Sequence, residues 1–135
     1  MNIYDVDEWI VVADRDFFSA NYLMSAYPKP LEVICYLCAQ AIEKYLKSYL
    51  VYNDIIPDKT HNLVVLLNQC ISIDTSFSTC RNECRIINKF NNKIRYPKSI
   101  SVTEEETRYV INSTEKIKNL DIFTKIRIEI DNNKK

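Results

Sequence analysis

The sequence contains no glycine among its 135 residues, although average usage would give roughly nine or ten. Glycine-rich phosphate loops and the dinucleotide-binding fingerprint need backbone positions that only glycine tolerates, so both are excluded. Tight Asn-Gly hairpins are also absent, which counts against a β-sandwich or a barrel. The missing glycine therefore predicts an all-α fold, most simply a helical bundle with few tight turns.

Charge and hydropathy predict one globular domain over residues 1–135. The 18 basic and 18 acidic side chains cancel, so any site for nucleic acid must be a local basic patch. No apolar run approaches the roughly 18 residues of a membrane span, and the acidic segment Met1–Glu8 does not fit a signal peptide. We expect no membrane association and a cytoplasmic location, with the five cysteines as free thiols.

Apolar residues recur at helical spacing through the first half of the chain. The spacing predicts a first helix over residues 6–26, opened by a capping-box-like pair, Asp5 and Glu8. A second helix over residues 31–52 is apolar nearly all round and belongs at the centre of a bundle. We expect Thr60 to cap a third helix.

The second half of the chain is less regular. We expect a fourth helix over residues 77–94, stopped by Pro97, and a fifth that begins at the capping box of Thr103 and Glu106. The strict alternation over residues 121–130 has the period of a strand, and leaves open a frayed helix end or a short extended tail. Residues 131–135 are expected to be disordered, with the core within residues 6–120.

The second predicted helix carries four polar residues, Gln40, Glu43, Lys44 and Lys47. Their spacing places Gln40, Lys44 and Lys47 along one stripe, with Glu43 one turn before Lys47. One interpretation is a solvated stripe with a modest surface ion pair. The other is a pair of ammonium groups that line a cleft and bind phosphate.

Two further places could bind an anion. His61, the single histidine, is expected in the first turn of the third helix, where it could contact a phosphate or a base, or could pack the junction between loop and helix. At the end of the fourth helix, Arg95 either complements the helix dipole or acts as a bidentate anion fork beside Tyr96.

Two cysteine pairs, Cys35 with Cys38 and Cys80 with Cys84, have spacings that invite a zinc site. Both pairs stand in apolar helical runs without the turn residues of a zinc knuckle. We therefore expect core thiols, with no metal and no cofactor.

Four blocks of the sequence together resemble the HEPN domain family. The first is Trp9-x3-Ala13-x2-Asp16-x3-Ala20-x2-Leu23, and the second is Cys38-Ala39-Gln40-Ala41-Ile42-Glu43-Lys44-Tyr45-Leu46-Lys47. The third and fourth are Thr60-His61-Asn62-Leu63 and Arg95-Tyr96-Pro97. The resemblance covers about residues 6–120 and implies a five-helix, largely up-and-down bundle that is often dimeric.

Many HEPN proteins are metal-independent endoribonucleases with an arginine followed, after four to six residues, by a histidine. This sequence departs from that motif, because neither Arg95 nor Arg81 is followed by a histidine at that distance. The resemblance therefore implies a non-catalytic module that binds nucleotide or RNA and pairs with a minimal nucleotidyltransferase, as in toxin–antitoxin systems. The alternatives are an endoribonuclease toxin with a degenerate site, and a purely structural homodimer.

These observations define one candidate anion site between the second helix and the end of the fourth. Lys44, Lys47 and Arg95 would supply the positive charge, with His61 and Tyr96 beside them. With no glycine to form a backbone nest, any nucleotide must be held by side chains that project from helices.

Overall fold

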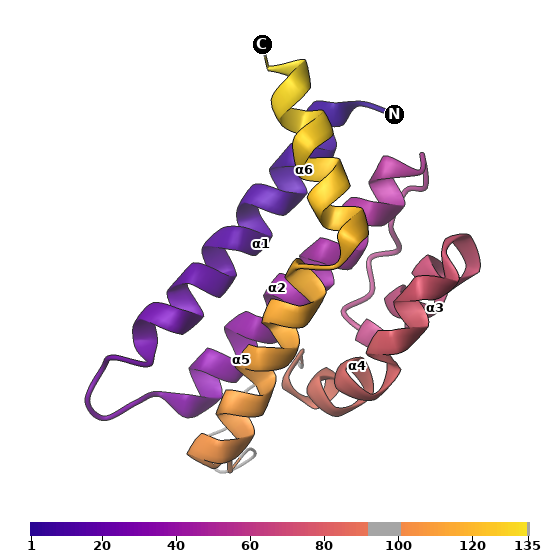
Figure 1. Ribbon diagram of the computed structural model, residues 1–135. Helices are drawn as coiled ribbons and strands as arrows, with labels where there is room; N and C mark the ends of the chain where they lie inside the picture. Colours follow the sequence, from indigo (N-terminus) through magenta and orange to yellow (C-terminus); the bar gives the residue numbers. More distant parts are fainter. Residues whose placement is uncertain (92–100, 135) are drawn as a thin grey trace.

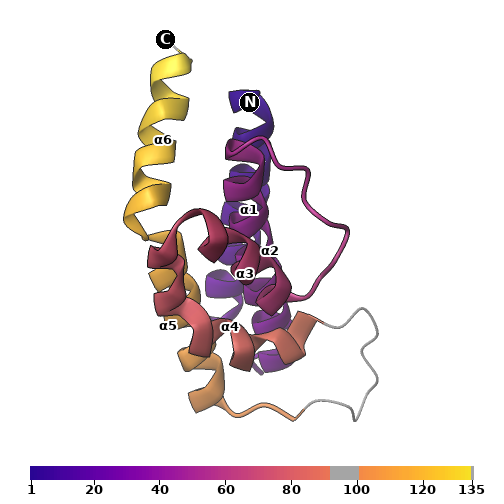
Figure 2. The ribbon, with the colours of Figure 1, turned by 90° about the vertical axis from the view of Figure 1, so that its right-hand side faces the viewer.

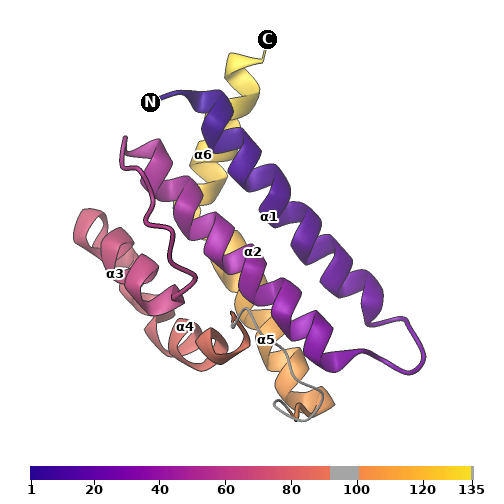
Figure 3. The same cartoon turned by 180° about the vertical axis from the view of Figure 1, so that it is seen from behind.

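A computed structural model describes residues 1–91 and 101–134 of the chain. All regular structure in these two ranges is helical, as the missing glycine predicts. Two long helices, α1 (Ile3–Leu23) and α2 (Leu31–Tyr52), lie side by side and antiparallel (Figures 1 and 3). The shorter helices α3 (Leu63–Ile73) and α4 (Arg81–Ile87) lie on the far side of α2, and α5 (Glu104–Lys118) packs along α2 (Figure 1).

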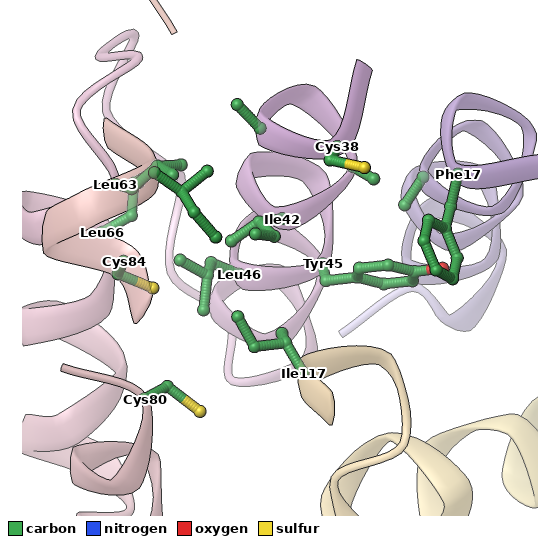
Figure 4. Packing of buried hydrophobic residues seen from close by; sticks show 14 of the residues in the cluster. Phe17, Cys38, Ile42, Tyr45, Leu46, Leu63, Leu66, Cys80, Cys84 and Ile117 are labelled. Carbon is green, nitrogen blue, oxygen red and sulfur yellow. The ribbon is translucent and has the colours of Figure 1, made fainter. Parts of the chain in front are cut away.

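The central position predicted for residues 31–52 is confirmed, because α2 packs against α1, α3 and α5. Its side chains point to both sides of the molecule: Tyr45 reaches towards α1 and Phe17, while Ile42 and Leu46 face α3 (Figure 4). Because one helix supplies both halves of the apolar core, α2 can be buried nearly all round. Polar side chains on this helix must therefore find partners inside the protein.

The first helix starts earlier than the pattern predicts. Asn2 is its N-cap, with a side-chain oxygen that accepts the Tyr4 backbone N–H at 2.9 Å, so Asp5 and Glu8 do not form the expected cap. Asparagine is among the strongest N-cap residues, which explains why α1 begins at Ile3. The helix ends at Leu23 rather than at residue 26.

Residues 75–91 do not form the single fourth helix that the apolar spacing predicts. A 3₁₀ helix, η1 (Thr75–Cys80), is followed by α4 and then by a second 3₁₀ helix, η2 (Asn88–Asn91). In η2, Asn88 accepts a hydrogen bond from the Leu63 backbone N–H, and Asn91 bonds to the loop before α3. These contacts hold the chain in the tighter 3₁₀ geometry. The predicted continuation over residues 92–94 lies outside the described residues.

The predicted capping box at the start of α5 is confirmed. The Thr103 hydroxyl accepts the Glu106 N–H at 3.0 Å, and the Glu106 carboxylate turns back to the Thr103 N–H. This reciprocal pair satisfies two backbone donors that would otherwise have no partner at the helix end.

The end of the chain is a regular helix, α6 (Asp121–Asn133), where the sequence left a frayed end or an extended tail open. Phe123, Ile126 and Ile130 are buried, while Ile128 is 57% exposed. The buried residues follow helical spacing, so the extended tail suggested by the strand-like alternation is wrong. Residues 131–133, predicted to be disordered, continue this helix.

The predicted fold class is confirmed, and residues 1–91 and 101–134 hold a sixth α-helix, α6, where the sequence predicts five. Among the described residues, no helix is both long enough and apolar enough to cross a membrane. The N-terminal end of α1 and the C-terminal end of α6 lie at the same end of the molecule (Figures 1 and 2).

Candidate functional site

The candidate site residues that the structure describes meet where α2 passes the loop before α3. Lys44 and Lys47 come from α2, and His61 comes from the loop that joins α2 to α3. The other two candidates, Arg95 and Tyr96, lie outside the described residues. What the described candidates can do depends on the carboxylates beside them.

Glu43 is the centre of this site, with a side chain only 4% exposed. One oxygen, Oε2, accepts from Lys47 Nζ at 3.0 Å, and the other, Oε1, bonds to His61 Nδ1 at 3.0 Å and accepts from Asn91 Nδ2 at 2.7 Å. Burial by itself would raise the pKa of Glu43, but the hydrogen bonds from Lys47, His61 and Asn91 outweigh it and lower the pKa. Glu43 is therefore a buried anion held by three neighbours.

Asn91 of η2 connects Glu43 to the surrounding backbone. Its amide nitrogen also donates to the His61 carbonyl oxygen at 2.6 Å, and its amide oxygen accepts a hydrogen bond from Gln40. The side chain of Asn91 is buried and uses both ends of its amide. It thereby joins α2, η2 and the loop before α3 into one network.

The same network continues to α1. The Gln40 side-chain oxygen accepts from Lys44 Nζ at 2.9 Å, and that ammonium also contacts Asp16 Oδ2 at 3.0 Å. At the other end, Lys47 Nζ lies 5.7 Å from the centre of the Trp9 ring. We call the seven residues that these bonds link the α2 polar network: Asp16, Gln40, Glu43, Lys44, Lys47, His61 and Asn91.

The charges of the α2 polar network balance within it. Lys44 pairs with Asp16, and Lys47, whose side chain is 8% exposed, pairs with Glu43. The interpretation of Glu43 and Lys47 as a surface ion pair is wrong, because both side chains are buried. An incoming phosphate would have to compete with a carboxylate for either lysine, which raises the energetic cost of an anion site at Lys44 and Lys47.

His61 does not lie in the first turn of α3, because that helix begins at Leu63. Asn62 is the N-cap and accepts from the Val64 and Val65 N–H groups at 2.9 and 3.2 Å, so the expected cap at Thr60 is also wrong. Thr60 instead accepts the Asn62 N–H, one step earlier in the loop. The His61 ring points back to Glu43, and its side chain is 38% exposed.

A second polar cluster, which no pattern in the sequence marks, joins α1 to α6. Asp14 of α1 forms a two-pronged ion pair with Arg127 of α6, with both N···O distances at 2.8 Å, and accepts a hydrogen bond from the Tyr45 hydroxyl. Burial alone would raise the pKa of Asp14, yet the bonds from Arg127 and Tyr45 lower it. The pairing spans 113 residues of sequence, so no local pattern could reveal it.

The cysteines are buried thiols, as predicted for core positions. All five are free, and burial raises the pKa of Cys38 and of Cys70 to about 12. In residues 1–91 and 101–134, no group of three or more His, Cys, Asp or Glu side chains is placed to hold a metal ion.

Together, the helical architecture and the α2 polar network define a small bundle domain organised around a polar segment of its central helix. A model of the HEPN domain matches residues 6–124, and the chain belongs to the HEPN family. No curated protein matches the chain in a sequence search.

A solved structure has the same fold. It is the crystal structure of ST0689, described as an archaeal HEPN homologue, with a TM-score of 0.67 and 23% sequence identity. The similarity covers 93% of this chain and 97% of that one. At this identity the likeness extends to the fold alone.

Proposed function

We propose that this HEPN-family chain is a non-catalytic binding module that pairs with a minimal nucleotidyltransferase, as in toxin–antitoxin systems. The observation that carries the proposal is the closure of the α2 polar network. The residues that carry the family resemblance in α2 bond to one another and hold α1, η2 and the loop before α3 in place. They act as structural supports for the surfaces that a partner would contact.

A catalytic role for the described candidates fits this geometry poorly. A general acid or base must come within hydrogen-bond reach of the substrate. The buried ammonium of Lys47 already donates to Glu43 and lies 5.7 Å from the centre of the Trp9 ring. One ring nitrogen of His61 also bonds to Glu43. Any nucleotide or RNA would approach this region at the exposed part of His61.

Co-expression with the product of the neighbouring open reading frame tests the pairing, because the proposal requires that this frame encode a minimal nucleotidyltransferase. We expect the two proteins to elute together in size-exclusion chromatography at a defined ratio. Separate elution of two folded proteins would contradict the pairing. For ligand binding, calorimetry with AMP tests the anion site that the sequence suggests. A site that uses Lys47 and Arg95 would lose affinity in Lys47→Ala and in Arg95→Ala, and unchanged affinity in both would remove it.

The competing activity, ribonuclease action with a degenerate site, is tested by incubating purified protein with RNA in the presence of a chelator. The proposal predicts intact RNA. RNA cleavage by the wild-type chain that Arg95→Ala abolishes would overturn the non-catalytic assignment.

A second candidate function, homodimerisation, is favoured by the outer face of α1. This face carries Tyr4, Val11 and Phe18 at seven-residue intervals, and Glu8, Arg15 and Tyr22 at the same interval. Phe18 and Tyr22 are 72% and 70% exposed, and their rings stack at 6.5 Å. Aromatic side chains this exposed along one helix indicate a surface that another protein covers.

The charges on this face suit a second copy of the same chain. If two α1 helices pack antiparallel about a two-fold axis near Val11 and Val12, Glu8 lies opposite Arg15 of the partner subunit, and this pair occurs twice. Tyr4 then lies opposite Phe18 of the partner subunit, beside a hollow of about 460 Å³ lined in part by Val11, Arg15 and Phe18. One helix face is a small interface, so we expect dissociation in the micromolar range.

Charge reversal tests this dimer directly. Light scattering should show that Glu8→Arg and Arg15→Glu each favour the monomer, because each places like charges opposite one another. The double variant should restore the dimer, since the swapped pairs are again complementary. As a matched control, Val65→Glu adds a charge to α3, on the far side of α2, and should leave the dimer intact. A wild-type monomer at about 100 μM would contradict the proposal.

A further inference from the structure

Helices α3 and α4 lie on the side of α2 away from α1 (Figures 1 and 2). Side chains of these two helices line a groove. Its volume is about 270 Å³, and it is lined by Val64, Leu67, Asn68, Arg81, Asn82 and Arg85. The buried Leu67 and the half-buried Val64 form an apolar floor. The four polar side chains are exposed around this floor, so the groove is open to a ligand from solvent.

The groove is positively charged. Arg81 and Arg85 stand four residues apart on α4 and therefore share one face of that helix. The described lining contains no carboxylate, and neither arginine forms an ion pair with a described residue. Arg81 makes one long contact, 3.4 Å from Nη1 to the Asn68 side-chain oxygen.

The nearest acidic side chain in sequence is used elsewhere. Glu83 lies between the two arginines in sequence but pairs with Lys116 of α5. The two guanidinium groups therefore repel each other without a counter-charge in the groove. An anion bound between them would remove that repulsion.

We propose that this groove binds a phosphate ester. Guanidinium groups match phosphate oxygens with two parallel N–H···O bonds, and the amides of Asn68 and Asn82 can add donors at the rim. The apolar floor would take the carbon part of the ester. Typical small-molecule pockets measure about 300–1,000 Å³, so a groove of about 270 Å³ fits a phosphate with a short attached group.

The site is separate from the α2 polar network, and the inference goes beyond the proposed function. A phosphorylated small molecule and a nucleic acid strand carry the same phosphate ester, and the groove could take it from either source. Because α1 lies on the other side of α2, occupation of the groove leaves the α1 face open (Figure 3). A result at one surface is therefore distinguishable from a result at the other.

Amide NMR titrations test the site with three probes: inorganic phosphate, AMP and a single-stranded RNA of about ten nucleotides. We expect shifts confined to residues 64–68 and 81–85. In Arg81→Ala/Arg85→Ala, affinity should fall at least about tenfold, since two charge-assisted contacts are lost. The control Arg108→Ala/Lys125→Ala removes two exposed cations from other helices, α5 and α6, and should bind as the wild type does.

The outcomes separate the sources of the phosphate. If phosphate and AMP bind and RNA binds no more tightly than they do, the natural source is a small phosphorylated metabolite. If RNA alone binds, the source is a nucleic acid strand. Unchanged affinity in the arginine double variant would overturn the site, as would the absence of shifts in the groove with all three probes at about 10 mM. Both double variants should keep the wild-type melting midpoint, because all four side chains are exposed.

Discussion

At the scale of single residues, Glu43 is the buried charge on which the α2 polar network depends. Glu43→Ala would leave the Lys47 ammonium, 8% exposed, without its counter-charge. Removing one partner of a buried ion pair costs about 3–5 kcal/mol. We therefore expect urea denaturation to show a loss of about 3 kcal/mol or more in the free energy of unfolding.

A double variant provides the control for Glu43→Ala. Glu43→Ala combined with Lys47→Met removes both charges, and should recover about 1–2 kcal/mol over the single variant because no unpaired ammonium remains buried. A double variant no more stable than Glu43→Ala would show that charge pairing is not the cause. Glu104→Ala is the surface comparison, because Glu104 forms ion pairs with Lys29 and with Arg108 at the protein surface. This variant should leave the unfolding midpoint nearly unchanged.

Asp14 gives stability a defined dependence on pH. Its folded-state pKa lies below the ordinary value of 3.8, because the bonds from Arg127 and Tyr45 outweigh burial. The folded state therefore binds this proton less readily than the unfolded state, and the stabilisation is present above about pH 4 and lost as pH falls through the folded pKa. Asp14→Asn should destabilise the protein at pH 7, with a smaller difference from wild type near pH 2.5. Urea denaturation at both pH values measures this, and a constant difference would contradict it.

At the scale of elements, the segment that forms α6 fits both the two-residue period of a strand and the period of a helix. Residues 125–130 alternate as a strand would, yet Ile126 is fully buried and Ile128 is 57% exposed. Ile126→Ala should cost about 2–4 kcal/mol of unfolding free energy, and Ile128→Ala under about 0.5 kcal/mol. An extended tail would place both side chains on one face, so equal effects of the two variants would contradict the helix.

The elements that the sequence predicts correctly are those specified by neighbours along the chain. The apolar stripes of α1 and α2, and the capping box of Thr103 and Glu106, need only residues within one or two turns. The break in residues 75–91 depends on bonds from Asn88 and Asn91 to partners at least 25 residues away. Such contacts leave no periodic signal, and this is why a single helix was expected there.

The candidate site divides in the same way. The spacing of Gln40, Glu43, Lys44 and Lys47 identifies a polar stripe on α2, and the structure brings His61 to it. Asn91 lies 48 residues from Glu43 and has no local pattern that marks it. The spacing on α2 alone suggests that Lys44 and Lys47 are free to bind phosphate. In the structure, Lys44 pairs with Asp16 and Lys47 pairs with Glu43.

At the scale of the whole molecule, α2 separates two surfaces that have different properties. The outer face of α1 is rich in exposed aromatic side chains, while the α3–α4 groove on the far side is basic. Between them lies a core that contains all five cysteines. Access to these thiols therefore reports on the opening of the core rather than on either surface.

Thiol labelling should consequently follow global unfolding. In the native protein, a disulfide reagent can reach the sulfurs only after the core opens, because all five are buried. Burial also raises the pKa of Cys38 and of Cys70 to about 12, which leaves little reactive thiolate at neutral pH. We expect slow reaction in buffer, and rapid reaction of all five thiols in guanidinium. Stabilising conditions should slow labelling, whereas Glu43→Ala should accelerate it, because the reactive population grows as unfolding becomes easier. A thiol that reacts at once in the native wild-type protein would place that cysteine outside the packed core.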